Sequence, residues 1–210
     1  MNRGFFVAID GPSGIGKSTV TAALAGQLAG QGLPVLATKE PTASPLGSLT
    51  RFGTDDYQGL ALACLVAADR YQHLETEIRP ALASGTVVVC DRYVASSLVL
   101  QRLDGVPPKF LWALAEQADR PDLTVILTGD PIRSRERAAR RGLYNRFHRG
   151  GPEAGAAEAE AYRAVAAELQ AAGHAVVVHD IGTQTAEEVA AVLAASVLSR
   201  REGNWTTAPS

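Results

Sequence analysis

The sequence is poor in several residue types, and each shortage excludes a class of protein. Only 2 of its 210 residues are cysteine, which excludes a small domain held together by disulfides. Because Cys64 and Cys90 lie in apolar stretches without ligand-like spacing, we expect two buried thiols and no structural metal. No apolar run approaches the roughly 18 residues that a membrane-spanning helix requires, so a transmembrane protein is excluded.

Lysine is also scarce, and the overall charge is small. Three of the 20 basic residues are lysine and 17 are arginine, yet the net charge is only −2, unlike that of a non-specific nucleic-acid binder. Seven arginines fall between Arg133 and Arg149, and a local cluster in a near-neutral chain indicates a small polyanionic ligand. The first apolar run, residues 5–9, is shorter than a signal-peptide core, so we expect a cytoplasmic protein.

Strand-like and helix-like segments alternate along the chain. Continuous apolar runs predict buried parallel strands, and Ala/Leu-rich stretches between them predict helices. This alternation indicates an α/β fold in three layers, with a five-stranded parallel sheet flanked by helices, in a single domain over residues 1–202 followed by a flexible tail, 203–210. The predicted strands are 5–9, 34–38, 86–90, 123–127 and 175–179; the predicted helices are about 17–31, 57–84, 107–119, 131–141, 155–172 and 185–200.

A phosphate-binding motif follows the first predicted strand. Residues 11–19 read GPSGIGKST, a full match to G-x-x-x-x-G-K-[ST], and they open the first helix, which indicates a P-loop NTPase fold. The loop amides would wrap the phosphates of ATP, Lys17 would reach the β- and γ-phosphates, and the Ser18 hydroxyl would bind Mg²⁺. The predicted ATP-binding residues of this loop are Gly11, Ser13, Gly14, Ile15, Gly16, Lys17, Ser18 and Thr19.

Charged residues that follow later strands add to this site. Asp91 and Arg92 come directly after the third strand, where the acid would share the magnesium ion with Ser18 and the arginine would hold a second phosphate. Asp69 and Arg70 interrupt an apolar helix, which favours either a polar cleft or a structural ion pair. The arginine-rich segment, about 133–155 with its Gly-rich end, favours a lid over the phosphates, with a solvated helix face as the alternative.

These segments together resemble the thymidylate kinase family of P-loop nucleoside-monophosphate kinases, from Ile9 to about Ala195. Lys39-Glu40-Pro41 is similar to the family's Arg-Glu-Pro segment, Arg70 to its base-contacting arginine, and residues 91–97 to its signature after the third strand. The resemblance implies a kinase that uses Mg²⁺ and transfers a phosphoryl group from ATP to a nucleoside monophosphate, either dTMP or a related or modified nucleotide. It also suggests a homodimer, as family members often form, and we expect no nucleic-acid or membrane partner. The acceptor-binding residues it implies are Lys39, Glu40, Pro41, Arg51, Val66, Arg70, Arg92, Ser96, Ser97 and Leu100.

The resemblance also completes the ATP site and the catalytic set. Arg137, Arg141 and Arg146 resemble the lid arginines that stabilise the transferred phosphoryl group, and residues 180–189, beginning with Asp180, resemble the segment that closes over the ATP base. A monophosphate oxygen is already a nucleophile at neutral pH, so catalysis can rest on alignment and charge neutralisation. The catalytic residues implied are Lys17, Asp91, Arg92, Arg141 and Arg146.

Several positions depart from the family pattern. Ser13 stands where an acid is usual, Val66 where a phenylalanine stacks on thymine, and Ser97 and Leu100 where an amide and an aromatic are common. Asn145 and His148 replace acids of the lid. A specialised phosphate acceptor, a deoxynucleoside kinase with Glu40 as base, and a P-loop module without an acceptor therefore stay open as alternatives, although no N-K-x-D motif of GTPase switches is present.

Overall fold

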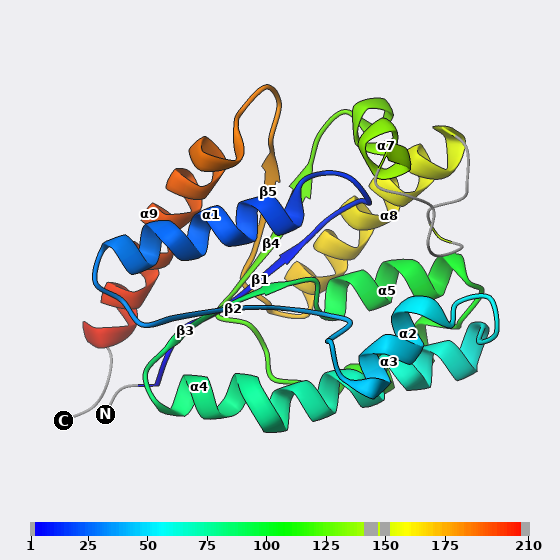
Figure 1. The fold of residues 1–210 in the computed structure, drawn as a ribbon, viewed down its shortest axis with the longest axis horizontal. Helices are drawn as coiled ribbons and strands as arrows, with labels where there is room; N and C mark the ends of the chain where they lie inside the picture. The colour runs from blue at the N-terminus through cyan, green and yellow to red at the C-terminus, as the bar shows by residue number, and fades with distance from the viewer. Residues whose placement is uncertain (1–2, 141–146, 148–151, 207–210) are drawn as a thin grey trace.

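The computed structural model describes residues 3–140, 147 and 152–206. Its centre is a five-stranded sheet in the order β2-β3-β1-β4-β5, and all neighbouring strands are parallel (Figure 1). The predicted α/β fold is therefore confirmed, with strand bounds within one residue of those expected. The strands are β1 (Phe6–Asp10), β2 (Val35–Lys39), β3 (Val87–Asp91), β4 (Leu123–Thr128) and β5 (Val176–Asp180).

Helices cover both faces of the sheet and complete the three layers (Figure 1). One face carries α1 (Lys17–Gly30) and α9 (Ala186–Thr206), whose apolar residues pack on alternate side chains of β1, β3 and β4. On the other face lie α3 (Gly59–His73), a π-helical turn η1 (Leu74–Ile78), α4 (Arg79–Ala83), α5 (Val94–Leu103), α6 (Pro108–Ala115) and α8 (Pro152–Ala171). Two further helices, α2 (Pro45–Phe52) and α7 (Pro131–Arg140), flank the carboxyl ends of the strands.

The sheet register positions the site. β1 and β3 consist of apolar residues followed by an acid, and every residue in them is buried. Ile9 pairs with Asp91, and Lys39 pairs with the same residue from the other side. The ends of β2, β3 and β1 therefore lie level, which brings the loops that follow them together at one edge of the sheet.

Two short helices were not expected from the sequence. α2 contains Pro45 and Gly47, and it forms because Pro fits the first helical position while Ser44 Oγ caps the helix by accepting from Gly47 N at 3.0 Å. α5 follows β3 after only two residues, and its serines and valines give it no clear helical signal. The predicted helix 57–84 is present, interrupted by η1.

Some predicted boundaries differ from those observed. α8 already begins at Pro152, before the predicted helix start at about residue 155, and α9 continues to Thr206, past the expected start of a tail at 203. Cys90 is buried as expected, but Cys64 is exposed because it lies on the outer face of α3. Among the described residues, no helix combines the length and apolar character needed to cross a membrane.

Candidate active site

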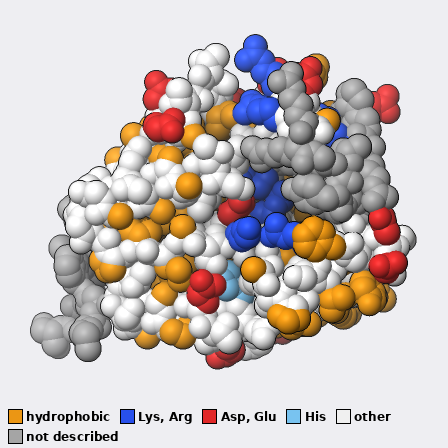
Figure 2. Space-filling view, viewed as in Figure 1, with side chains coloured by type: hydrophobic (Ala, Val, Ile, Leu, Met, Phe, Trp, Pro, Cys, Tyr) orange, Lys and Arg blue, Asp and Glu red, His pale blue; other side chains and the backbone are white. Residues whose placement is uncertain are grey.

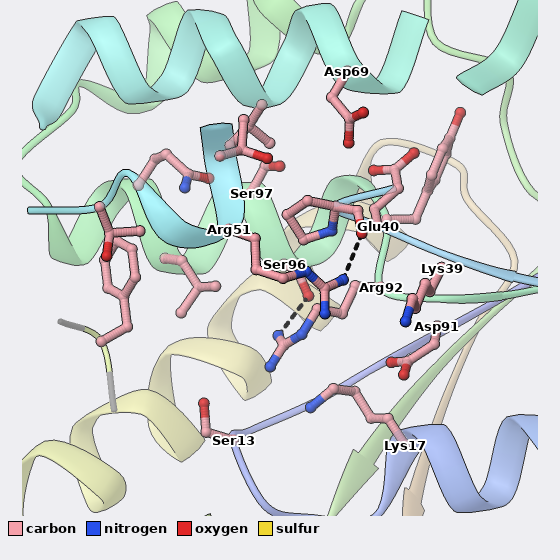
Figure 3. A pocket seen from close by; sticks show the side chains of 18 of the residues that line it. Ser13, Lys17, Lys39, Glu40, Arg51, Asp69, Asp91, Arg92, Ser96 and Ser97 are labelled. Atoms are coloured by element: carbon pink, nitrogen blue, oxygen red, sulfur yellow. Dashed lines mark hydrogen bonds between the residues drawn. The ribbon is translucent and has the colours of Figure 1, made fainter. Parts of the chain in front are cut away.

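A cavity of about 210 Å³ lies at the carboxyl ends of β1, β2 and β3. The P-loop closes one side, and residues of α3 and α5 form the opposite side (Figure 3). In the space-filling view this part of the molecule is a hollow in which lysine and arginine side chains gather (Figure 2). A concave, cationic surface of this kind suits a ligand with several phosphates.

The P-loop takes the conformation that its glycines allow. Gly11 and Gly14 have φ of 145° and 77°, and a Cβ on Gly14 would lie 1.9 Å from the Ser134 carbonyl oxygen, so a side chain is excluded there. Lys17, the first residue of α1, donates from Nζ to the carbonyl oxygens of Gly11 and Pro12, both at 2.8 Å. Burial, with a contribution from the nearby Arg92 cation, lowers the pKa of Lys17 to about 7. An anionic ligand in the loop would favour the charged ammonium.

Ser18 and Asp91 offer oxygen ligands for a divalent cation. Ser18 Oγ donates to Asp91 Oδ2 at 2.5 Å, which joins the start of α1 to the end of β3. The other carboxylate oxygen, Asp91 Oδ1, is buried and has no hydrogen-bond partner among the described residues. A hydroxyl and a carboxylate with a spare oxygen are hard donors that suit Mg²⁺, so these residues fit the expected metal.

Arg92 enters the cavity between the two sides (Figure 3). Its φ of 72° is in the left-handed region, and its Nη1 donates to Ser96 Oγ and to the Tyr162 hydroxyl, both at 3.2 Å. Burial opposes the charge, but Tyr162, Asp91 and other neighbours raise the pKa of Arg92 above its ordinary value. The side chain is therefore a fixed cation held by two hydroxyls, and among the described residues no other group bonds to its guanidinium, which leaves part of the fork for a phosphate.

Arg70 is part of a buried network behind the acceptor side of the cavity. Its Nε donates to Glu40 Oε2 at 2.9 Å, with 3% and 5% of the two side chains exposed, and its Nη2 donates to Ser97 Oγ at 2.6 Å. Asp69 instead accepts from the backbone N–H of Thr42 at 2.8 Å, which fixes the segment after Pro41. The two charged residues of α3 thus bond to different partners, and both line the polar cleft that the sequence favoured.

Comparisons with known proteins agree with this geometry. The family model described as Thymidylate kinase matches residues 9–193. The chain belongs to the thymidylate kinase family. A probable thymidylate kinase of Pyrococcus horikoshii is 39% identical over 153 residues, which cover 69% of this chain and 75% of the relative. The thymidylate kinase of Leifsonia xyli subsp. xyli is 38% identical over 176 residues, covering 80% and 84%.

A solved structure of thymidylate kinase from Candida albicans shows the same fold. It superposes with a TM-score of 0.76 at 21% identity and covers 95% of this chain and 93% of its own. Since membership of the thymidylate kinase family is established by the sequence matches, the chain is a nucleoside-monophosphate kinase, and the predicted resemblance is confirmed.

Most residues predicted for this kinase site line one cavity. They are Ser13, Gly14, Gly16, Lys17, Ser18, Lys39, Glu40, Pro41, Arg51, Val66, Arg70, Asp91, Arg92, Ser96, Ser97 and Leu100. Ile15 is buried in the core beside α9, and Gly11 and Thr19 do not line the cavity. Arg137 and Asp180 are exposed outside it, and their ATP-binding roles stay predictions. Arg141, Arg146, Asn145 and His148 lie outside the described residues.

Sequence reasoning missed several residues that the geometry brings to the site, among them Gln101 and Glu158. Gln101 lines the cavity one helical turn after Ser97, and its buried Oε1 has no partner in the described part of the chain. Its spacing of four residues from Ser97 was a usable signal. Glu158 of α8 is buried, and its Oε1 accepts from Ser13 N at 3.1 Å and from Ser13 Oγ at 3.0 Å. A carboxylate therefore does contact the P-loop, but it comes from a distant helix.

His73 joins Glu40 to the surface of the molecule. Its Nδ1 lies 3.4 Å from Glu40 Oε1, and its Nε2 lies 2.9 Å from Glu77 Oε2 and 2.8 Å from Thr38 Oγ1. Together with Cys90, Glu40 and His73 place potential metal-ligating atoms within 4.8 Å of one another. Because Glu40 also holds Arg70 and the Cys90 thiol donates to the Arg92 carbonyl oxygen, the cluster serves as a hydrogen-bonded support for the acceptor side.

We expect this support to weaken as the pH rises. Burial opposes protonation, but the hydrogen bonds and charges of Glu40 and Glu77 raise the pKa of His73 above its ordinary 6.5. A raised folded-state pKa gives stability that is complete below the unfolded pKa and is lost as pH rises through the folded one. His73→Gln should therefore lower the free energy of unfolding by about 1–3 kcal/mol at acid pH, and by less at alkaline pH. Urea unfolding at several pH values tests this; a difference independent of pH would contradict it.

Proposed function

We propose that the chain transfers the γ-phosphoryl group of ATP to dTMP, giving ADP and dTDP, and that the cavity described above holds the reacting groups. The observation that carries this assignment is that one cavity unites a donor-phosphate loop with a separate set of cations on the acceptor side. Phosphoryl transfer needs little covalent chemistry from the protein, because alignment and charge neutralisation supply most of the rate.

The donor phosphates would lie on the P-loop. Loop amides and the N-terminal end of α1 surround the position next to Lys17, whose ammonium already bonds to two loop carbonyl oxygens. In this scheme Lys17 contacts the transferred group. Ser18 and Asp91 would hold Mg²⁺, which neutralises phosphate charge when bound.

The acceptor phosphate would lie between Arg92, Lys39 and Arg51. Arg92 and Lys39 come from adjacent strand ends, and Arg51 of α2 is held by a 2.6 Å bond from its Nη2 to the Pro41 carbonyl oxygen (Figure 3). The pyrimidine base would lie deeper, against Val66 and Leu100, which are half-buried and line the cavity. Three cations more than neutralise the two negative charges of a monophosphate ester.

Glu40 is not placed as a general base in this scheme. Its carboxylate bonds to Arg70 and lies against His73, and it is 6% exposed, so its oxygens serve structure. A phosphate acceptor needs no base, because its oxygen is already ionised near neutral pH. Because the Glu40 carboxylate is held by Arg70 and His73 and does not act as a base, a monophosphate is favoured over a nucleoside as the acceptor.

An acceptor panel tests this function. ADP release should be followed with dTMP, dUMP, dCMP, thymidine and simple phosphate esters, each with MgATP. We expect dTMP to give the highest kcat/KM and thymidine to give no turnover. If thymidine or a phosphate ester without a base were the better substrate, the acceptor assignment would be wrong, and the deoxynucleoside kinase or the specialised-acceptor alternative would replace it.

Gln101 gives a sharper test of where the base binds. Its buried amide would pair with the base edge, since its Oε1 has no partner among the described residues and a pyrimidine N–H would supply the donor that it lacks. Gln101→Leu should raise KM for dTMP about 10–100-fold, because a lost hydrogen bond inside a dry site is worth about 1–3 kcal/mol. The affinity for ATP should stay unchanged in calorimetry. An unchanged KM would place the base elsewhere.

A further inference from the structure

One buried face of α8 changes character along the helix. Glu158, Tyr162, Val165 and Leu169 recur at intervals of three or four residues, so they lie on the same face, and all four are buried. Val165 and Leu169 pack in the apolar core against α5 and β4. Glu158 and Tyr162 are polar. A buried acid on such a face is costly unless it has hydrogen-bond partners, and here the partners belong to the active site.

Glu158 holds the tip of the P-loop from the side of α8. Its Oε1 accepts from Ser13 N at 3.1 Å and from Ser13 Oγ at 3.0 Å, so both donors of Ser13 bond to one carboxylate. The next loop residue, Gly14, lies against α7, where an added Cβ would be 1.9 Å from the Ser134 carbonyl oxygen. The tip of the loop is therefore fixed from two sides, by hydrogen bonds to α8 and by close packing against α7.

Tyr162, one turn further along α8, holds the acceptor side of the site. Its hydroxyl accepts from Arg92 Nη1 at 3.2 Å and lies 2.9 Å from Ser96 Oγ. Residues four apart on a helix lie next to each other on its surface. Two neighbouring side chains of α8 thus bond to the loop that follows β1 and to the loop that follows β3.

The Glu158 carboxylate also lies within electrostatic reach of cations on both sides of the site. Burial lowers the pKa of Lys17 to about 7, and Glu158 is among the acids that oppose this shift. Burial opposes the charge of Arg92 as well, yet its neighbours, Glu158 among them, raise its pKa. A carboxylate that acts on a donor-side and an acceptor-side cation lies between the two halves of the site.

We propose that Glu158 and Tyr162 are positioning residues that hold the P-loop and Arg92 at a fixed spacing for phosphoryl transfer. The inference rests on the proposed function, because it takes Arg92 to bind the acceptor phosphate. Reacting atoms must approach to roughly 3–3.5 Å, and a displacement of about 1 Å can cost about 10²-fold in rate. A helix anchored in the core and bonded to both loops limits such displacement. Neither side chain lines the cavity, so both act through Ser13 and Arg92.

Single-turnover kinetics on the full chain tests this pair, with MgATP and the best acceptor of the panel both at saturation. Glu158→Leu removes the bonds to Ser13, and Tyr162→Phe removes the hydroxyl that holds Arg92. We expect each variant to slow transfer about 10–100-fold. In calorimetry, Glu158→Leu should leave the affinity for the acceptor unchanged, and Tyr162→Phe should leave the affinity for MgATP unchanged.

The double variant separates positioning by one helix from two local roles. Losing either set of bonds already frees one loop from the other, so Glu158→Leu combined with Tyr162→Phe should be about as slow as the slower single variant. Losses that multiply in the double variant would overturn the proposal. Full transfer at saturation in either folded single variant would overturn it too, because α8 would then only support one loop.

Conservative variants and controls exclude a general loss of structure. Glu158→Gln keeps an oxygen for Ser13 and should stay within about threefold of the wild-type rate; a loss as large as that of Glu158→Leu would contradict positioning by hydrogen bonds. Tyr71→Phe, which loses a 2.9 Å bond to the Leu114 carbonyl oxygen, and Glu160→Leu, at an exposed position of α8, should leave transfer unchanged. Thermal melts confirm that each variant is folded. Wild-type protein that fails to use dTMP would refute the proposed function, whereas failure of this inference shows only in the comparison of variants.

Discussion

Replacing Lys17 by Met should lower kcat for dTMP phosphorylation about 10²–10³-fold, the usual loss when one preorganised donor to a developing charge is removed. Lys17 is 5% exposed, and its ammonium is the P-loop cation next to Ser18 and Asp91. A methionine occupies nearly the same volume without the charge. KM for dTMP should change little, because Lys17 lies on the donor side.

Unlike its activity, the thermal stability of the Lys17→Met variant should not fall. Burial lowers the pKa of Lys17 to about 7, which means that the ligand-free fold carries an ammonium it disfavours. Removing that group should leave the melting temperature equal to or above that of the wild type. Lys109→Met, at an exposed position of α6, is the matched control and should change neither quantity. If Lys17→Met kept its turnover, or lost it through unfolding, the donor side of the scheme would fail.

The sequence contained the parts of this site that depend on contiguous residues. The P-loop is one stretch of chain after a buried strand, and residues 91–97 are another, so their composition alone predicts where phosphates bind. The strands could be predicted from the sequence equally well. Runs such as Val87–Cys90 are apolar throughout, because both faces of a parallel sheet are buried. The fold class also predicted that the site lies at the carboxyl ends of the strands.

Other features depend on contacts between distant residues and left no local signal. Glu158 reaches Ser13 across 145 positions, and an acid on a charged helix looks like a solvated residue until the helix is packed. Cys90 was expected to be a buried thiol without ligand-like spacing, and His73 carried no local signal, yet α3 and β3 bring the two together beside Glu40. Helix α2 depends on the Ser44 cap and on a proline at its first position, which together offset a glycine within its eight residues.

The second large loss of activity is expected at Arg92. Here the contributions of the backbone and of the side chain can be tested separately. A non-glycine residue in the left-handed region costs about 1–2 kcal/mol, and Arg92 has φ of 72°. Arg92→Gly removes that cost together with the guanidinium. Ser96 keeps its 2.9 Å bond to the Tyr162 hydroxyl and its bonds to Asp10, so the loop retains most of its support. We expect the free energy of unfolding to be unchanged or higher.

Activity of Arg92→Gly should fall about 10³-fold or more in kcat/KM for dTMP, the scale of an arginine that neutralises a transferring phosphoryl group. Arg92→Lys should fall less but still clearly, since a lysine keeps the charge and loses the planar fork that bonds two oxygens at once. Guanidinium added to the glycine variant should restore part of the turnover, because the small cation can enter the space that the side chain left. Steady-state kinetics with dTMP varied, beside urea unfolding of both variants, measures these effects. Full kcat/KM in a folded Arg92→Gly protein would remove Arg92 from the acceptor side and leave Lys39 and Arg51 to hold the monophosphate.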